Sequence, residues 1–272
     1  MKQKSGTLVR VITGTALLAV LCACAYLGPE MRLCFFYAVI WFAAREMSDA
    51  LNRMGFSTSP WIARIVALIC CVLFYFRDET AFYLSAGSIV LMLAMLAALF
   101  KKIPMRDVLG SCIVCFYPTA FLLGYAYLSV QPDTLFWPVL LITLFAAAGC
   151  DVFAYFFGRA FGRHKLCPSI SPHKTVEGAL FGTLFGTALG MLAWVLLKDF
   201  APIPFYVYLI ASFFCTIAGQ LGDLCASVIK RQAGIKDFSD LLPGHGGFID
   251  RTDSFSFALP VVFFILLLFR AL

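Results

Sequence analysis

Three acidic residues in the C-terminal part of this 272-residue chain have spacings that suit metal-assisted phosphate chemistry. Asp223 precedes Ser227 by four positions and Lys230 by seven, so a continuous helix would place the three side chains on one stripe. Asp250 and Asp253 are three positions apart and would share one side of a first helical turn. Converging carboxylates repel one another unless a divalent cation neutralises them, and hard oxygen ligands favour Mg²⁺. We therefore interpret these three aspartates as metal ligands.

Basic residues and a glycine-rich turn accompany the acids. The turn Pro243-Gly244-His245-Gly246-Gly247 lacks bulk, so its backbone N–H groups could approach phosphate oxygens closely. The neighbouring Lys and Arg side chains supply positive charge for the same oxygens. Acids, cations and turn together indicate metal-assisted phosphoryl or nucleotidyl transfer. The residues expected to bind phosphate here are Ser227, Arg231, Lys236, His245, Gly246, Gly247 and Arg251.

A second group of candidates lies upstream. Asp151 falls within an apolar run, where an ionised carboxylate costs roughly 2.5–3.5 kcal/mol on insertion scales, so a functional role is the default interpretation. A structural pairing of Asp151 with Arg159 or Lys174 is the alternative. Lys174 could bind a phosphate, and Glu177 could orient it or cap a helix. We expect catalytic roles for Asp223, Asp250, Lys230 and Lys174, and substrate-binding roles for Ser171, Glu177 and Asp151.

Apolar helices must carry these residues. Of the chain, 62% is hydrophobic and 13% is charged, which excludes a soluble globule, a disordered protein and a nucleic-acid-binding arm. A membrane span needs about 20 apolar residues. We therefore predict an all-α, polytopic integral membrane protein with about nine transmembrane helices. The expected spans are 11–27, 31–45, 61–76, 81–99, 108–129, 135–157, 178–197, 203–222 and 254–270.

The distribution of basic residues predicts the orientation. If the N-terminus is cytosolic, 17 of the 21 Lys and Arg residues fall on the inside, as the positive-inside rule expects. Two inside loops, 158–177 and 223–253, are long enough for chemistry and contain all three histidines. We thus predict transmembrane helices in 1–134, a catalytic transmembrane region in 135–272, and an active site that faces the cytosol at a bacterial-type plasma membrane.

The stretch 227–253 resembles the full signature of the phosphatidate cytidylyltransferase (CDP-diacylglycerol synthase) family, and none of its 27 positions departs from that pattern. The upstream stretch 151–177 is similar to the family's second conserved region, which commonly reads Ser-Pro-Lys-Lys-Thr with Glu-Gly following. His173 replaces the first of those lysines here. Residues 1–130 match only as a series of apolar spans. The matching signature residues are Ser227, Lys230, Arg231, Lys236, Asp237, Pro243, Gly244, His245, Gly246, Gly247, Asp250, Arg251 and Asp253.

The resemblance implies a reaction in which CTP and phosphatidic acid give CDP-diacylglycerol and pyrophosphate. It implies metal-ligand roles for Asp223 and Asp250, with Asp253 beside them, and substrate-binding roles for the basic signature positions. It also implies Mg²⁺ as the cofactor, a monovalent cation such as K⁺ as a candidate second ion, and a homodimer in the lipid bilayer.

Two other functions remain open from the sequence. A related CTP-dependent enzyme could act on a polyprenol or another lipid phosphate, because acyl-chain recognition would reside in ordinary apolar helices. An ion-coupled transporter would also suit an intramembrane acid, although the acids concentrate at span ends and the glycine turn has no evident transport role. The Asp-Gly-x-x-Ala-Arg motif of amino-alcohol phosphotransferases is absent from the sequence.

Overall fold

The structure, a computed structural model, describes residues 2–76 and 103–269, and it confirms the predicted all-α class. One antiparallel hairpin of two strands is the only sheet in these ranges. Contacts divide the chain into two compact units, one of residues 1–130 and 232–251, the other of residues 131–231 and 252–272. Segment 232–251, which carries the glycine-rich turn, thus belongs with the N-terminal helices.

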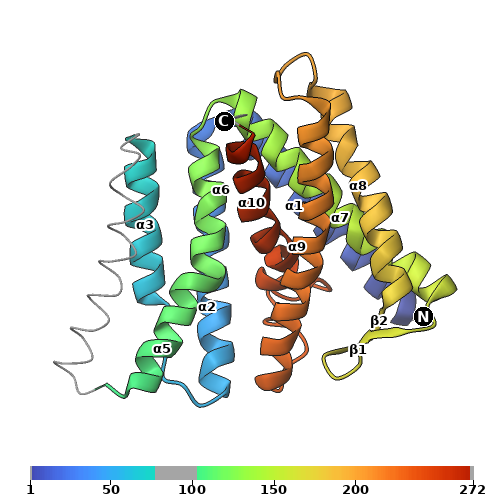
Figure 1. Cartoon of the computed structure of the whole chain (residues 1–272). Helices are drawn as coiled ribbons and strands as arrows, with labels where there is room; N and C mark the ends of the chain where they lie inside the picture. Colours follow the sequence, from blue (N-terminus) through green and yellow to red (C-terminus); the bar gives the residue numbers. More distant parts are fainter. Residues whose placement is uncertain (1, 77–102, 270–272) are drawn as a thin grey trace. The chain divides into compact units, whose positions relative to one another are not determined.

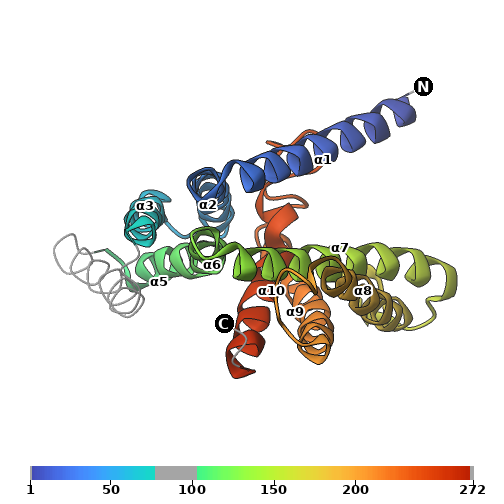
Figure 2. The same cartoon turned by 90° about the horizontal axis from the view of Figure 1, so that it is seen from above.

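The first unit is built on α2, whose apolar face packs against its neighbours. Phe36 of α2 stacks on Tyr125 of α6 with ring centroids 5.3 Å apart. Figure 2 shows α3, α2 and α6 grouped together. The helices of this unit are α1 (Lys2–Leu27), α2 (Pro29–Arg53), α3 (Trp61–Tyr75), α5 (Met105–Val114), the π-helical η1 (Cys115–Ala120) and α6 (Phe121–Ser129).

The second unit is dominated by the close packing of α7 against α8, which run side by side in Figures 1 and 2. A Cβ on Gly182 or Gly186 of α8 would lie 2.8 Å from a backbone carbonyl oxygen of α7, so only glycine permits this approach. The elements of this unit are α7 (Asp133–Phe161), β1 (Lys165–Cys167), β2 (Ser171–Thr175), α8 (Val176–Leu197), α9 (Phe205–Gln232) and α10 (Ile249–Leu268), of which the first turn belongs to the other unit.

Five helices of the described ranges are long and apolar enough to cross a membrane. They match five predicted spans: 108–129, 135–157, 178–197, 203–222 and 254–270. Spans 11–27 and 61–76 correspond to shorter apolar helices, and span 31–45 is helical within α2. Span 81–99 lies outside the described residues. The structure therefore supports a polytopic membrane protein, while the number of nine spans and the cytosolic N-terminus stay predictions.

The two loops predicted for chemistry are shorter than expected. Helix α7 continues to Phe161 and α8 begins at Val176, so 158–177 is mostly a hairpin with helical ends. Helix α9 continues to Gln232 and α10 begins at Ile249, so 223–253 is helical at both ends. Polar residues end an apolar run without ending a helix, which explains why hydropathy misplaced these boundaries.

Candidate functional site

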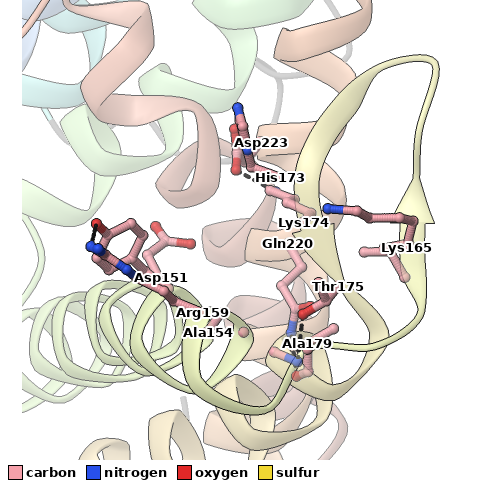
Figure 3. Close-up of a pocket in the computed structure, with 15 residues that line it drawn as sticks. Asp151, Ala154, Arg159, Lys165, His173, Lys174, Thr175, Ala179, Gln220 and Asp223 are labelled. Atoms are coloured by element: carbon pink, nitrogen blue, oxygen red, sulfur yellow. Dashed lines mark hydrogen bonds and ion pairs between the residues drawn. The ribbon is translucent and has the colours of Figure 1, made fainter.

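A pocket in the second unit, lined in part by charged side chains, collects residues from α7, the hairpin, α8 and α9 (Figure 3). Its volume is about 630 Å³. Asp151 of α7 faces it together with residues three, four, seven and eight positions later, which share one face of that helix. Helix α9 contributes Gln220 and Asp223, again three positions apart, and the hairpin contributes Lys165, His173 and Lys174.

Lys174 and Asp223 form an ion pair in this pocket. The two side chains are 28% and 26% exposed, so the pair is shielded from bulk water and still open to the pocket. Sequence reasoning offered Asp151 or a phosphate as the partner of Lys174, whereas the structure pairs it with Asp223. A cation and a carboxylate held together in a shielded pocket can accept an anionic ligand and a metal ion, respectively.

Two further carboxylates belong to the same unit. Asp253 is 8% exposed, accepts a hydrogen bond from the Ser254 backbone N–H at 2.7 Å, and interacts electrostatically with Asp223 and Asp151. The Ser254 hydroxyl donates to Oδ2 of Asp151 at 3.2 Å. Lys230 offsets part of this negative charge. The second unit thus gathers three of the predicted acids with two of the predicted cations.

The hairpin is held in place by side chains at its base. Glu177 accepts hydrogen bonds from the backbone N–H groups of Arg163 and His164 at 3.0 and 3.2 Å, and its Oε1 lies 2.6 Å from Nδ1 of His164. Thr175 caps α8 by accepting from the Gly178 N–H at 3.1 Å. Glu177 therefore shapes the segment that presents Lys174 and does not line the pocket itself.

Residues of α9 also contact the hairpin. Arg231 donates from Nε to the Ile170 carbonyl oxygen at 3.3 Å, in the turn between β1 and β2. Ser227 is buried on α9, on the predicted stripe with Asp223 and Lys230. The helical stripe proposed from the sequence is therefore confirmed, because α9 continues through all three positions.

Residues 233–248, which join α9 to α10 and are called the signature loop below, form a compact turn in the first unit with its own pocket. Gly244 and Gly246 have φ angles of 74° and 77°, which favour glycine, and the Leu242 N–H donates to the Gly246 carbonyl at 2.9 Å. The side chain of His245 lies against Gly14 of α1. A pocket of about 480 Å³ is lined by Lys236, Asp237, Asp240, Leu242, Pro243, Gly244, His245, Gly246 and Arg251.

Two carboxylates hold the backbone that follows this turn. Oδ2 of Asp250 accepts from the N–H groups of Phe238 and Gly247 at 2.8 and 2.9 Å. Glu46 of α2 accepts from the N–H groups of Phe248 and Ile249, both at 2.9 Å. The Gly247 N–H, predicted to bind phosphate, is thus engaged within the protein. The expectation that the turn exposes its N–H groups is wrong at that position.

The environment of Glu46 acts on its pKa in two opposite directions. It lies one residue beyond predicted span 31–45 and is 4% exposed. Burial raises the pKa of Glu46, and the hydrogen bonds from Ile249, Ser239 and Phe248 act in the opposite direction by stabilising the carboxylate. The hydrogen bonds from the loop therefore stabilise the charged form of Glu46, and the same hydrogen bonds hold the loop in place.

The carboxylates suit a hard cation by their chemistry, but they do not form a closed metal cage. Within the described ranges no group of three or more His, Cys, Asp or Glu side chains is placed to hold a metal ion. Lys174 occupies one side of Asp223 instead. Oxygen donors from Asp223 and Asp253 fit Mg²⁺, which commonly keeps several waters and substrate phosphates as ligands. The metal-ligand roles, and the convergence of Asp250 with Asp223, stay predictions.

Sequence reasoning missed several residues of these two sites. Glu46 and Ser239 hold the signature loop, and Gln220 lines the pocket of the second unit with its amide on the Thr183 hydroxyl at 2.8 Å. The only sequence signal for Glu46 was an acid directly after an apolar run. Its partners lie about 200 residues away, and one sequence contains no signal for such a pairing.

Comparison with known proteins shows that nearly all of the chain is similar to one protein family. Residues 8–269 match the cytidylyltransferase family. A phosphatidate cytidylyltransferase of Staphylococcus saprophyticus is 31% identical over 257 residues, which cover 93% of this chain and 96% of that protein. Its Aquifex aeolicus counterpart is 35% identical over 224 residues, covering 82% and 77%. A Bacillus subtilis phosphatidate cytidylyltransferase is 45% identical over 119 residues, 44% of each chain.

Proposed function

The chain belongs to the cytidylyltransferase family, and from this premise we propose that it transfers CMP from CTP to phosphatidic acid. The products are CDP-diacylglycerol, a precursor in phospholipid biosynthesis, and pyrophosphate. The observation that carries the proposal is the pocket of the second unit, where Lys174 and Asp223 meet among apolar helices. Such a pocket can admit a charged headgroup while acyl chains stay in lipid. The names of full-length relatives support the choice of substrates.

The proposed chemistry is an in-line displacement. A phosphate oxygen of phosphatidic acid attacks the α-phosphorus of CTP, a new P–O bond forms, and the bond from the α-phosphorus to the bridging oxygen breaks. Pyrophosphate leaves with the electron pair of that bond. The lipid phosphate already carries negative charge near neutral pH, so it needs little help from a base. The main obstacle is the mutual repulsion of two anionic reactants.

We propose that basic side chains of both units reduce this repulsion between the reactants. Lys174 and Lys230 of the second unit would bind phosphate oxygens, with Lys174 exchanging its contact with Asp223 for one with substrate. Lys236 and Arg251 line the loop pocket of the first unit and would bind phosphates there. A guanidinium can bind two phosphate oxygens at once, which helps to orient the reacting group.

Mg²⁺ is the proposed cofactor. Asp223 and Asp253 would hold it together with Asp250, and a monovalent cation such as K⁺ is proposed as a second ion. When bound, Mg²⁺ neutralises charge on the phosphates and polarises them. The carboxylates would hold the metal ion beside the phosphates. Asp151 is connected to Asp253 through its neighbour Ser254, whose hydroxyl donates to Asp151.

The membrane arrangement is proposed from charge and composition. Polar residues of the pocket lie at the ends of apolar helices, and most Lys and Arg residues fall on the side assigned to the cytosol. We infer a bacterial inner-membrane protein with a cytosolic N-terminus, a cytosol-facing site and a homodimeric assembly. CTP would arrive from water and phosphatidic acid from the bilayer.

The deciding experiment uses purified protein in detergent with Mg²⁺, labelled CTP and phosphatidic acid. We expect label in a lipid-soluble cytidine product, equimolar pyrophosphate, and loss of both after chelation of the metal. A parallel assay offers a polyprenol phosphate in place of phosphatidic acid. Cytidine transfer to the polyprenol phosphate alone would favour the alternative of a related CTP-dependent enzyme. Ion-driven uptake by proteoliposomes in the absence of CTP turnover would instead favour the transporter and overturn the proposal.

A further inference from the structure

Glu46 is buried in α2 yet bonds almost entirely to a segment about 200 residues later. The Ser239 hydroxyl and the Phe248 N–H donate to its Oε1 at 2.6 and 2.9 Å. The Ile249 N–H donates to its Oε2 at 2.9 Å. A carboxylate offers about four acceptor positions, so three hydrogen bonds leave Glu46 little capacity for a substrate or an ion. Its contacts are with the signature loop.

The location of two of these hydrogen bonds matters, because their donors are Ile249, the first residue of α10, and Phe248, the residue before it. The N–H groups at a helix N-terminus lack partners within the helix, and the helix dipole favours an anion there. Glu46 meets both needs from a different helix. The ring of Phe42, one turn earlier on α2, stacks on Phe248 with centroids 5.1 Å apart and planes 9° from parallel. Helix α2 thereby fixes both the backbone and the side chain that precede Asp250.

Asp250 completes the same arrangement from within the loop. Its Oδ2 accepts from Phe238 and Gly247, so two carboxylates together bind four backbone N–H groups of one short segment. The space is tight, since a Cβ on Gly247 would lie 2.5 Å from Oε2 of Glu46. A substitution at Glu46 should therefore alter the backbone at residues 247–249, which directly precedes Asp250 and Arg251.

We propose that Glu46 is a positioning residue for the reaction, fixing the start of α10 so that Asp250 and Arg251 are presented to the triphosphate of CTP. It does not touch substrate. The inference rests on the proposed function, because it assigns the loop pocket to CTP. It gives the N-terminal half of the chain a part in nucleotide binding, through one side chain of α2.

The test compares Glu46→Gln with Asp49→Asn in the full-length protein. A glutamine presents an NH₂ group where one carboxylate oxygen accepts, so it cannot serve all three donors. Asp49 lies on the same helix, is 58% exposed and pairs with Arg45 at 3.6 Å, which makes it a charge-matched control. Hydrogen exchange of peptides covering 238–250 is measured without nucleotide. The KM for CTP and the KM for phosphatidic acid are then measured separately.

We expect Glu46→Gln to speed exchange in 238–250 by about tenfold and to raise the KM for CTP by a similar factor, in line with the loss of a hydrogen bond to a charged group. The KM for phosphatidic acid should change less than twofold, and Asp49→Asn should leave all three values unchanged. Glu46→Asp keeps the charge and should recover part of the CTP affinity. Ser239→Ala removes a single donor and should shift the same values more weakly, which provides a measurement if Glu46→Gln does not fold.

Each other outcome has a definite meaning. Faster exchange with an unchanged KM for CTP would show that Glu46 only braces the fold, and unchanged exchange would show that it does not hold the loop; both overturn the inference. An equal rise in both KM values would overturn the assignment to CTP. If wild-type protein made no cytidine lipid, the proposed function would fail, whereas the exchange data would still report on the loop.

Discussion

At the scale of single residues, Lys174 and Asp223 pair with each other. The proposed reaction requires both groups, a cation to bind phosphate and a carboxylate to bind a metal ion. Both side chains are about three quarters buried, and because they pair with each other neither is an unpaired charge shielded from water. In the proposed reaction, a phosphate would bind the ammonium group of Lys174 and a metal ion would bind the carboxylate of Asp223.

This pairing leads to a prediction about two variants. Asp223→Asn should lower turnover by at least about a hundredfold, because the neutral amide lacks the negative charge with which the carboxylate would bind a divalent cation. Lys174→Ala should raise the KM for CTP or phosphatidic acid about tenfold, the usual loss for one charge-assisted hydrogen bond. Initial rates of cytidine-lipid formation provide the measurement. Lys198→Ala, at the C-terminal end of α8 and outside the pocket, is the matched control. Normal kinetics in Lys174→Ala would remove the hairpin from the site.

The sequence correctly predicted the relative positions of residues that lie close together in the chain, because their spacing determines which face of a helix they share. Asp223, Ser227 and Lys230 were placed on one helical stripe by counting, and α9 confirms it. Glu46 could not be found this way, because its importance comes from partners in another part of the chain. The Gly247 N–H was assigned to phosphate for a related reason, since the sequence does not show that Asp250 already accepts it.

At the scale of elements, the glycines of α8 control how closely that helix approaches α7. A Cβ on Gly186 would lie 2.8 Å from the Ala146 carbonyl and 2.9 Å from backbone and side-chain atoms of Cys150. Because backbone atoms cannot rotate away, the helices would have to separate. The same two helices contribute residues to the pocket, among them Asp151 of α7, and they support the hairpin. Their spacing therefore sets the width of the pocket.

We predict that Gly186→Ala destabilises the protein by about 1–3 kcal/mol, the usual range for overpacking. The midpoint of thermal unfolding in detergent should fall, and turnover should fall with it even at temperatures where the variant is folded. Leu184→Ala, at a side chain 61% exposed on the same helix, is the comparison and should shift the midpoint little. A Gly186→Ala protein as stable as wild type would show that α7 and α8 can move apart freely.

The elements themselves were predicted unevenly. Apolar runs identified the five long spans because burial in lipid demands such runs. Their ends were missed, since α7 and α9 extend through polar residues that remain compatible with a helix. The short hairpin between α7 and α8 was also missed. It depends on Glu177 and Arg231, which bind backbone groups that any sequence would supply.

At the scale of the whole molecule, the signature loop is contiguous with α9 and α10 in sequence but belongs to the unit of the N-terminal helices. Its supports come from α1, where the Thr13 hydroxyl donates to the Pro243 carbonyl at 3.1 Å, and from α2 through Glu46. A chain divided between residues 130 and 131 would retain the complete signature in its second piece. That piece would lack both supporting helices.

We therefore predict that a fragment of residues 131–272 makes no cytidine lipid, although it contains every residue of the signature. Co-expression with residues 1–130 should restore turnover, because the supports are then supplied in trans. The same pair carrying Glu46→Gln in the first piece should recover less, and the pair carrying Asp49→Asn should recover fully. Activity in the isolated second fragment would show that the loop needs no support from the first 130 residues.

Helix α10 contains Asp250 and Asp253 within one turn, and the boundary between the two units passes between them. Residues three apart on an α-helix keep Cβ atoms about 5–6 Å apart wherever the rest of the chain lies. The spacing of these two acids is therefore encoded locally and is established as soon as that turn forms during folding. Asp223 lies on a different helix, α9, so its proximity to Asp253 depends on contacts within the second unit between segments that are distant in sequence.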